Sequence, residues 1–418
     1  MVLSAEDRLA SVGVVTVVGV GADGWAGLAP VARRALAAAE VVVGSTRQLD
    51  LLPAACAAER VAWPTPLLPA VAPLLAAHAD KRLCVLASGD PMFFGIGATL
   101  ARHTAVHVLP HPSSASLACA RMGWALDRVT VVSTVARPVE RLHSALHPGS
   151  RVLVLSEGEA TPAAVAELVT ARGFGASPMT VLSDLGSPDE DVLRATAATW
   201  AGRVSPLNVI AVECVADPGA RLLPAVPGLP DDVYEHDGQI TKREVRALTV
   251  SSLAPEPGQL LWDVGAGSGS VGIEWSRVDP TCRAIAVEPR ADRADRVERN
   301  AAALGVPELR LVRGAAPAAL ADLPTPDAVF VGGGVTVDGV VDACWDALRP
   351  GGRVVVNAVT LESEALVARW HAAVGGALTR LSVARAAPIG GFTGWRQAMP
   401  ITQWVAVKPA GPESGEDQ

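Results

Sequence analysis

Apolar runs alternate with alanine-rich, helix-favouring stretches along the first half of the chain. The segments in order are "VVTVVGVG", "PVARRALAAAEVVVG", "RLCVLASGDP", "RVTVVST" and "RVLVLSEG". Strand-like runs separated by helical stretches are typical of βα units. The pattern therefore predicts an α/β fold with largely parallel strands in this half.

The alternation breaks near residue 216 and then starts again. The intervening segment "ADPGARLLPAVPGLPDD" is rich in Pro and Gly and has no apolar period, which indicates a linker. Five further strand candidates follow it in a Rossmann-like order: "QLLWDVGAG", "RAIAVEP", "LRLVRG", "DAVFVGGG" and "GGRVVVNAV". We therefore predict a first domain at 12–217, a linker at 218–227 and a second domain at 228–410. We expect the acidic tail "GPESGEDQ" to be disordered.

Composition narrows the class of protein. A chain of 418 residues exceeds one ordinary hydrophobic core, which fits two domains. No apolar run approaches the ~20 residues that span a bilayer, and "MVLSAEDRLASVG" lacks the apolar core of a secretory signal. With 35 Lys and Arg against 43 Asp and Glu there is no basic excess to attract nucleic acid. We expect a cytoplasmic homo-oligomer that binds neither membrane nor nucleic acid.

Cysteine and histidine spacing gives no metal site. The six cysteines form no CxxC pair, and the eight histidines and six cysteines show no zinc-type spacing. Four of the cysteines fall within or beside apolar runs that predict buried elements. A reducing compartment is the simplest setting for such thiols.

The stretch "LLWDVGAGSGSVGIEW" fits two glycine fingerprints. Gly267-x-Gly269-x-x-Gly272 matches a dinucleotide loop, whereas Asp263-x-Gly265-x-Gly267-x-Gly269 matches the first motif of S-adenosylmethionine (SAM) methyltransferases. Glu288 ends the next strand, where its carboxylate accepts ribose hydroxyl groups of either cofactor. Asp263 decides for SAM, because a dinucleotide site normally continues its apolar strand at that position.

Later segments agree with the SAM interpretation. Ala316 closes a "GAA" turn after the following strand, where adenine usually lies, and "LRPGG" precedes the last of the five strands. An NAD-dependent reductase, a non-catalytic SAM-binding module and an RNA methyltransferase remain alternatives. The last of these lacks an aromatic and basic strip, since the ten Trp are dispersed and the chain has one Tyr and five Phe.

From about Gly228 to Pro409 the chain resembles precorrin methyltransferases that methylate carbon 15 and decarboxylate an acetate arm. The matching segments are "GLPDDVYEHDGQITKREVRAL", "DAVFVGGG", "NAVTLE" and "GWRQAMPITQW". This resemblance and the glycine loop give one set of cofactor-binding candidates: Thr241, Asp263, Gly265, Ala266, Gly267, Ser268, Gly269, Glu288 and Ala316.

The first half resembles tetrapyrrole methylases, in particular those that methylate carbon 5, through "VGVGADGWAGL", "SGDPMFFGIG", "HPSSASLACARMGW", "LSEGEATPAAVAEL" and "SPLNVIAVE". The resemblance implies a two-lobed domain with SAM in the cleft. It also implies that the "GVG" loop at residues 19–21 is not the main SAM contact, and that the GDPxxxG loop is. The cofactor candidates in this loop are Gly89, Asp90, Pro91 and Gly95. The family's Ser-x-His-Gly-Arg segment reads Ser133-Thr134-Val135-Ala136-Arg137 here, without the His-Gly pair.

Together the two resemblances imply a fused enzyme of cobalamin biosynthesis with two SAM sites and a tetrapyrrole substrate. Methyl transfer from an activated sulfonium depends mainly on positioning, and decarboxylation has the conjugated ring as electron sink, so no further cofactor is needed. The acidic arms of the substrate need cations; the candidates are Lys242, Arg243, Arg246 and Arg396, of which the resemblance favours Arg243 and Arg396. His236 and Glu362 are possible proton carriers, but no catalytic residue is assigned.

Overall fold

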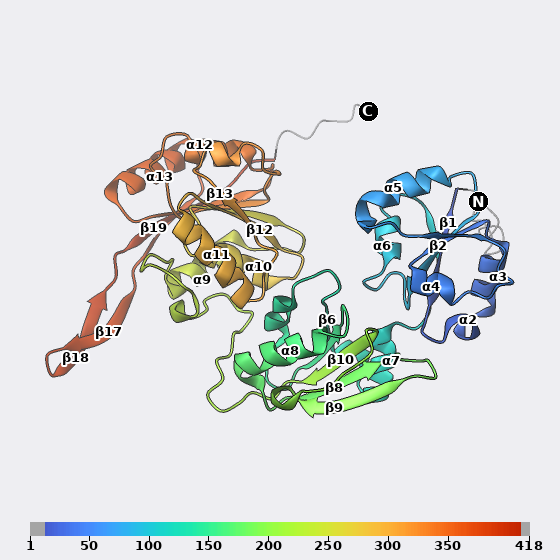
Figure 1. Cartoon of the computed structure of the whole chain (residues 1–418). Helices are drawn as coiled ribbons and strands as arrows, with labels where there is room; N and C mark the ends of the chain where they lie inside the picture. The colour runs from blue at the N-terminus through green and yellow to red at the C-terminus, as the bar shows by residue number, and fades with distance from the viewer. Residues whose placement is uncertain (1–12, 411–418) are drawn as a thin grey trace. The chain divides into compact units, whose positions relative to one another are not determined.

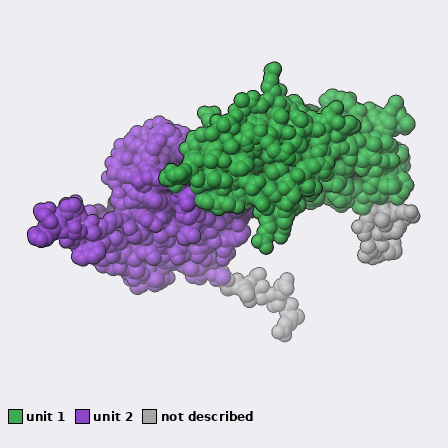
Figure 2. All heavy atoms as spheres, turned by 90° about the horizontal axis from the view of Figure 1, so that it is seen from below, with its two compact units in different colours: residues 1–139, 145–220 green, residues 140–144, 221–418 purple. Residues whose placement is uncertain are grey.

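The computed structural model describes residues 13–410, and these form two compact units (Figures 1 and 2). Unit 1 runs to Val139 and continues with Ala145–Ala220, whereas unit 2 contains Glu140–Ser144 and the chain from Arg221. The division at Ala220 falls within the Pro/Gly-rich segment. The expectations for the first twelve residues and for the acidic tail concern residues outside the described range.

The first sheet of unit 1 is parallel throughout, with strand order β3-β2-β4-β1-β5. Every residue of β1 and β2 is buried, as expected for strands covered on both faces. The strands are β1 (Val15–Val20), β2 (Val41–Gly44), β3 (Glu59–Ala62), β4 (Leu83–Ser88) and β5 (Val106–Leu109). The helices are α2 (Gly24–Gly27), α3 (Pro30–Ala38), α4 (Thr46–Asp50), α5 (Leu67–Ala77) and α6 (Ile96–Leu100).

The second sheet of unit 1 has the order β6-β7-β10-β8-β9 and is mainly antiparallel. Only β6 and β7 pair in parallel, so the prediction of largely parallel strands is wrong here. The turn between Ser183 and Asp191 is too short for a crossover helix, which forces β8 and β9 into a hairpin. The strands are β6 (Thr130–Ser133), β7 (Arg151–Leu155), β8 (Pro178–Ser183), β9 (Asp191–Thr196) and β10 (Asn208–Glu213). The main helices are α7 (Ser114–Met122) and α8 (Thr161–Val169), and the short turns are η1 (Leu126–Arg128), η2 (Val139–Ala145), η3 (Thr170–Phe174) and η4 (Ala197–Thr199).

Unit 2 is built on a seven-stranded sheet of order β13-β12-β11-β14-β15-β19-β16. Its first five strands are parallel and confirm the five predicted ones, whereas β19 runs antiparallel to β15 and β16. These are β11 (Leu260–Val264), β12 (Arg283–Glu288), β13 (Arg310–Arg313), β14 (Ala328–Val331), β15 (Arg353–Ala358), β16 (Ala377–Leu381) and β19 (Ile401–Val407). The helices are α9 (Arg243–Leu253), α10 (Ser270–Val278), α11 (Ala291–Ala303), α12 (Val340–Ala347) and α13 (Leu361–Val374), with short turns η5 (Asp231–Val233) and η6 (Ala318–Leu320).

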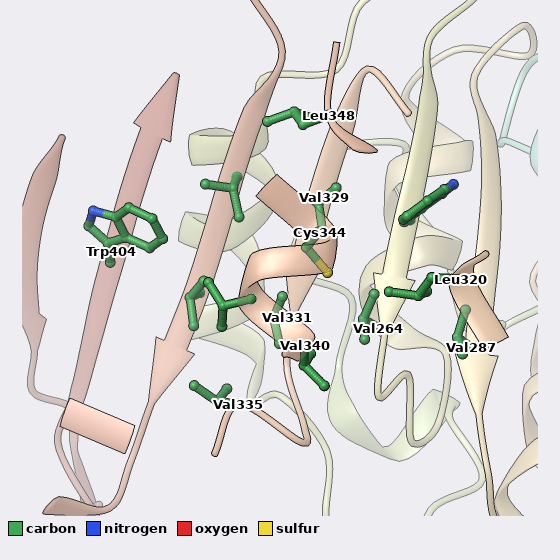
Figure 3. Close-up of a cluster of buried hydrophobic side chains, with 14 of the residues drawn as sticks. Val264, Val287, Leu320, Val329, Val331, Val335, Val340, Cys344, Leu348 and Trp404 are labelled. Carbon is green, nitrogen blue, oxygen red and sulfur yellow. The ribbon is translucent and has the colours of Figure 1, made fainter. Parts of the chain in front are cut away.

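One face of this sheet is closed by a core against α12 and α13. Figure 3 shows Val264 of β11 and Val329 and Val331 of β14 in the same layer as Cys344 and Val340 of α12. The indoles of Trp345, Trp370 and Trp404 pack together, with ring centroids 5.8 to 6.3 Å apart. The core fixes the carboxyl ends of the parallel strands, where the predicted site residues lie.

The hairpin of β17 (Ala384–Ile389) and β18 (Phe392–Gln397) was not anticipated from the sequence. It forms a separate two-stranded sheet and projects away from the rest of unit 2 (Figure 1). Large apolar side chains on and beside it are strongly exposed, including Phe392 at 84% and Trp395 at 77%. No helix among residues 13–410 is long and apolar enough to cross a membrane.

All six cysteines are buried and free, which confirms and extends the prediction made for four of them. They are Cys56 and Cys84 with the first sheet, Cys119 and Cys214 with the second, and Cys282 and Cys344 with the sheet of unit 2. Burial raises the pKa of Cys84 and of Cys344 to about 12 and that of Cys282 to about 11. These thiols are packing groups.

Candidate SAM sites

The glycine loop of unit 2 connects β11 to α10 and requires glycine for two different reasons. Gly265, Gly267 and Gly269 all have positive φ, at 69°, 61° and 75°. A Cβ on Gly265 would also lie 2.7 Å from the backbone of Gly333, whereas one on Gly267 would meet nothing within 4 Å. The loop is therefore packed on one side and open at Gly267.

Glu288 joins this loop to the end of β12. Its side chain is 3% exposed, and its Oε2 accepts from the Gly267 amide (2.8 Å) while its Oε1 accepts from the Arg290 amide (3.0 Å). An ionised carboxylate offers about four acceptor positions, so two remain after these bonds. Glu288 is thus held in place beside the open glycine with capacity to accept the two ribose hydroxyls.

Asp263 lies beneath the loop and is 1% exposed. Its Oδ2 accepts from the Gly272 amide (2.8 Å), and its Oδ1 has no hydrogen-bond partner among the described residues. Burial, with a smaller contribution from Glu288, raises the pKa of Asp263 to about 7. The third glycine of the dinucleotide pattern is explained by the same contact, because a Cβ at Gly272 would lie 3.0 Å from Asp263 Oδ2.

A polar bridge that the sequence did not reveal ties the loop to the segment before α9. Asn300 of α11 is buried, and its amide donates to the carbonyls of Ser268 (2.9 Å) and Glu235 (3.0 Å). Its Oδ1 accepts from the Glu235 amide (2.8 Å). Ser268 is also buried, and Ala316 is half-buried against the core. An asparagine within a helix carries no motif, so no sequence signal marked Asn300.

Arg246 is not a substrate contact, which corrects one of the four cationic candidates. It is fully buried, and its guanidinium contacts Glu274 (2.6 Å) and Asp231 (3.1 Å) and donates to the Thr241 carbonyl (2.5 Å). Glu274 on α10 also accepts from Tyr234 Oη (2.9 Å). Arg246 lies on the inward face of α9, where a buried carboxylate compensates its charge. It holds Thr241, a predicted cofactor residue, through the backbone.

The two favoured substrate cations are exposed, and an ion pair connects α9, which carries one of them, with the hairpin that carries the other. Arg243 is the first residue of α9, and Arg396 on β18 stands opposite Arg385 in the hairpin register. Arg385 forms an ion pair with Glu244, the residue next to Arg243. The third cationic candidate, Lys242, lies with its Nζ 3.9 Å from a carboxylate oxygen of Asp231.

The two possible proton carriers have different surroundings. His236 Nδ1 accepts a hydrogen bond from the Gly238 amide, and Glu362 borders a 660 Å³ cavity between α12 and α13.

Unit 1 contains a second cleft of about 470 Å³, lined by residues from both of its sheets. Gly89 and Gly95 of the GDPxxxG loop line it, as does Gly21. Asp90 and Pro91 are not among the lining residues. Asp90 Oδ1 accepts from the Met92 amide (2.8 Å), and Pro91 is buried with its carbonyl bound to the Gly97 amide, so these two shape the turn.

The segment that lacks His-Gly borders the same cleft through Ser133 and Val135. Ala136 has φ of 51°, a left-handed conformation that glycine adopts more easily. Arg137 lies over the ring of Phe94, 5.5 Å from its centroid, and Phe94 also lines the cleft. The backbone path therefore persists with alanine, and the cleft wall at this point is apolar.

A glycine loop between a parallel strand and a helix, with acids ending that strand and the next, is typical of SAM-dependent methyltransferases. Within residues 13–410 no group of His, Cys, Asp and Glu could hold a metal ion. Residues 14–201 match the Tetrapyrrole (Corrin/Porphyrin) Methylases, and residues 232–408 match the Precorrin methyltransferase domain.

Two curated relatives match almost the whole chain, and a third matches its second half. The precorrin-6Y C(5,15)-methyltransferase [decarboxylating] of a Sinorhizobium species is 52% identical over 94% of this chain and 96% of its own. The enzyme of that name from Mycobacterium tuberculosis is 47% identical over 94% of this chain and all of its own. A probable cobalt-precorrin-6B C(15)-methyltransferase (decarboxylating) from Pyrobaculum calidifontis is 36% identical over 40% of this chain and 90% of its own.

The chain belongs to the precorrin-6Y C(5,15)-methyltransferase (decarboxylating) family, which consists of SAM-dependent enzymes. The resemblance drawn from the sequence is confirmed, and an NAD-dependent reductase or an RNA methyltransferase is not favoured.

Proposed function

We propose that the chain methylates a precorrin at two positions with two separate SAM sites. Unit 2 methylates carbon 15 and removes carbon dioxide from an acetate arm, and unit 1 methylates carbon 5. The observation that carries the first assignment is Glu288, whose buried carboxylate is bound to the amide of the open Gly267. SAM supplies an activated methyl group, so the protein's task at both sites is to place donor and acceptor in line.

The length of a shorter relative supports the assignment of one methylation to each unit. The Pyrobaculum calidifontis protein carries a name that refers only to carbon 15 and decarboxylation, and it corresponds to 40% of this chain. The family match at residues 232–408 is of similar extent and lies within unit 2. Methylation of carbon 5 is then assigned to the tetrapyrrole methylase segment at residues 14–201, which contains the cleft.

In unit 2, Glu288 places negative charge beside the loop, and Asp263 adds negative charge below it once ionised, above about pH 7. A carboxylate near the sulfonium favours binding of a cationic donor, and Glu288 accepts from the ribose. Arg243 and Arg396 are exposed cations suited to the acidic arms of the ring. The conjugated ring accepts the electron pair of the breaking carbon–carboxylate bond, and a proton from solvent then replaces the carboxylate on that carbon, while the side chains hold the arm in position.

Two variants of the full chain test the assignment. Glu288→Ala removes the ribose acceptor of unit 2, and Val135→Trp fills the cleft of unit 1; Glu298→Ala and Val226→Trp, both at exposed positions, are the controls. Losing a charge-assisted hydrogen bond weakens SAM binding about 10- to 150-fold. Dialysis with radiolabelled SAM should therefore give two sites for wild type and controls, and one for each variant.

Mass spectrometry of the tetrapyrrole separates the two reactions. Glu288→Ala should lose the methylation that is accompanied by loss of carbon dioxide, and Val135→Trp should lose only the methylation without it. A Val135→Trp protein that no longer decarboxylates, or a Glu288→Ala protein that still binds two SAM at wild-type affinity, would contradict the two-site proposal.

The protein is also proposed to be a cytoplasmic homo-oligomer. Buried free thiols fit a reducing compartment, and the exposed β17–β18 hairpin offers apolar surface that a second copy would cover. Soluble monomers rarely leave a large aromatic pair such as Phe392 and Trp395 in water. This hairpin is the surface on which we expect the copies to associate.

A further inference from the structure

The cleft of unit 1 contains one charged side chain among its described lining residues, Arg47 of α4. The other lining residues are uncharged and most are apolar, including Leu86 of β4, Leu155 of β7, and Phe93 and Phe94 of the GDPxxxG loop. No carboxylate within residues 13–410 lies within ion-pair distance of Arg47. The Arg47 side chain is exposed to solvent and forms no ion pair within residues 13–410, so its guanidinium can bind an anion that enters the cleft.

The position of Arg47 is set by its neighbours. Ser45 caps α4, and its backbone amide donates to Gln48 Oε1 (2.8 Å), which fixes the direction of the Gln48 amide group. Gln48 Nε2 and Arg47 Nη2 each donate to Ser88 Oγ at 3.0 Å. Ser88 ends β4 and immediately precedes the GDPxxxG loop. The cation is therefore anchored at the predicted cofactor loop.

The same contacts orient the Ser88 hydroxyl. A hydroxyl has two acceptor positions and one hydrogen, and both acceptor positions of Ser88 are taken by Gln48 and Arg47. Its hydrogen must point elsewhere, and Ser88 itself lines the cleft. Arg47 uses one of its five N–H donors on Ser88, so several remain. The cleft thus presents a guanidinium and a hydroxyl donor side by side.

We propose that Arg47 and Ser88 form a carboxylate-binding site in the unit 1 cleft. Planar guanidinium groups bind carboxylates in a bidentate manner, and a neighbouring hydroxyl adds a third donor. Partial burial against the cleft wall lowers the pKa of Arg47, and the charge of Asp184 partly opposes this. The site rests on the proposed methylation in unit 1, where both reactants carry carboxylates: the methionine end of SAM and the acidic arms of the ring.

The test uses the full-length chain and the methylation that proceeds without loss of carbon dioxide. Arg47→Met removes the charge, Arg47→Lys retains it without the fork, Ser88→Ala removes only the hydroxyl, and Arg34→Met is an exposed control in the same unit. We expect Arg47→Met to raise one KM about 10- to 100-fold, Ser88→Ala to raise the same KM by less, and Arg47→Lys to restore part of it.

The reactant whose KM changes identifies the carboxylate. If the KM for SAM rises, decarboxylated SAM as a competitor should bind wild type and Arg47→Met equally, because it lacks the group that Arg47 holds. If the KM for the tetrapyrrole rises instead, its acidic arm is the partner. Both KM values within about threefold of wild type, or an effect on kcat alone, would overturn the site.

A different result would refute the proposed methylation by unit 1, on which the Arg47 site rests. A wild-type chain that adds no methyl group without carbon dioxide loss would refute the role of unit 1 itself. The decarboxylating methylation by unit 2 should stay unchanged in all four variants, which also shows that each variant is folded well enough to interpret.

Discussion

Asp263→Asn should stabilise unit 2 above neutral pH while weakening its SAM binding. The carboxylate is 1% exposed, one of its oxygens has no partner, and its pKa is raised from 3.8 to about 7. Between about pH 4 and about pH 7 the folded chain keeps a proton that the unfolded chain has released, so stability falls as pH rises through this window. Above about pH 7 both states are ionised and the loss is complete.

The size of the stability change follows from the two pKa values of Asp263. A rise from 3.8 to about 7 corresponds to about 4 kcal/mol, at roughly 1.4 kcal/mol per pKa unit. Asparagine keeps an acceptor for the Gly272 amide but buries an amide group that lacks a partner, which costs about 1 to 3 kcal/mol. The net gain at about pH 8 should therefore be about 1 to 3 kcal/mol.

Hydrogen exchange measured by mass spectrometry gives this stability locally, in peptides covering β11 and β12, after correction for the intrinsic effect of pH on exchange. Protection of these strands should fall from about pH 5 to about pH 8 in the wild type and in the exposed control Asp322→Asn, and stay level in Asp263→Asn. A bound sulfonium favours the ionised form, so wild-type SAM affinity in unit 2 should rise with pH through about 7. Parallel pH profiles in variant and wild type would refute the reasoning.

Two further changes test other parts of unit 2. Gly265→Ala places a Cβ 2.7 Å from the Gly333 backbone and should lower SAM affinity in unit 2 at least about tenfold, measured by calorimetry. Gly258→Ala, whose φ of 84° is equally left-handed but whose Cβ meets nothing, should cost only about 1 to 2 kcal/mol of stability and leave binding intact. Phe392→Ser with Trp395→Ser should reduce the oligomer mass found by light scattering, with Leu68→Ser, 68% exposed in unit 1, as control. An unchanged mass would exclude the hairpin as the contact.

The apolar runs predicted the five parallel strands of unit 2 because each is a continuous buried segment next to a helical stretch. The apolar runs did not predict the direction of the strands in the second sheet of unit 1. A buried strand has the same apolar sequence pattern whether it is parallel or antiparallel, and its direction depends on the length of the connection. The hairpin at Ala384–Gln397 was missed because its side chains are mostly exposed and give no buried period.

Some residues of the candidate sites could be predicted from sequence spacing, whereas their contacts could not. Spacing along one chain identified the loop glycines and Glu288, because the carboxyl ends of adjacent parallel strands must meet. Spacing could not show that Asp263 binds Gly272, or that Arg246 is buried by Glu274, which lies 28 positions further along the chain. Arg47 belongs to no motif, and only the folded cleft shows that it lacks a counter-ion.

Two buried free cysteines lie in or next to the hydrophobic core of each of the three large sheets. Their reaction with a thiol reagent can therefore measure how often each sheet opens. A thiol that is buried and protonated does not react with an alkylating reagent until its surroundings open. With the reagent in excess, the labelling rate of each cysteine measures how often its own layer opens. Identification of the labelled peptides then gives three opening free energies from one unmodified protein, without a fluorophore or an engineered probe.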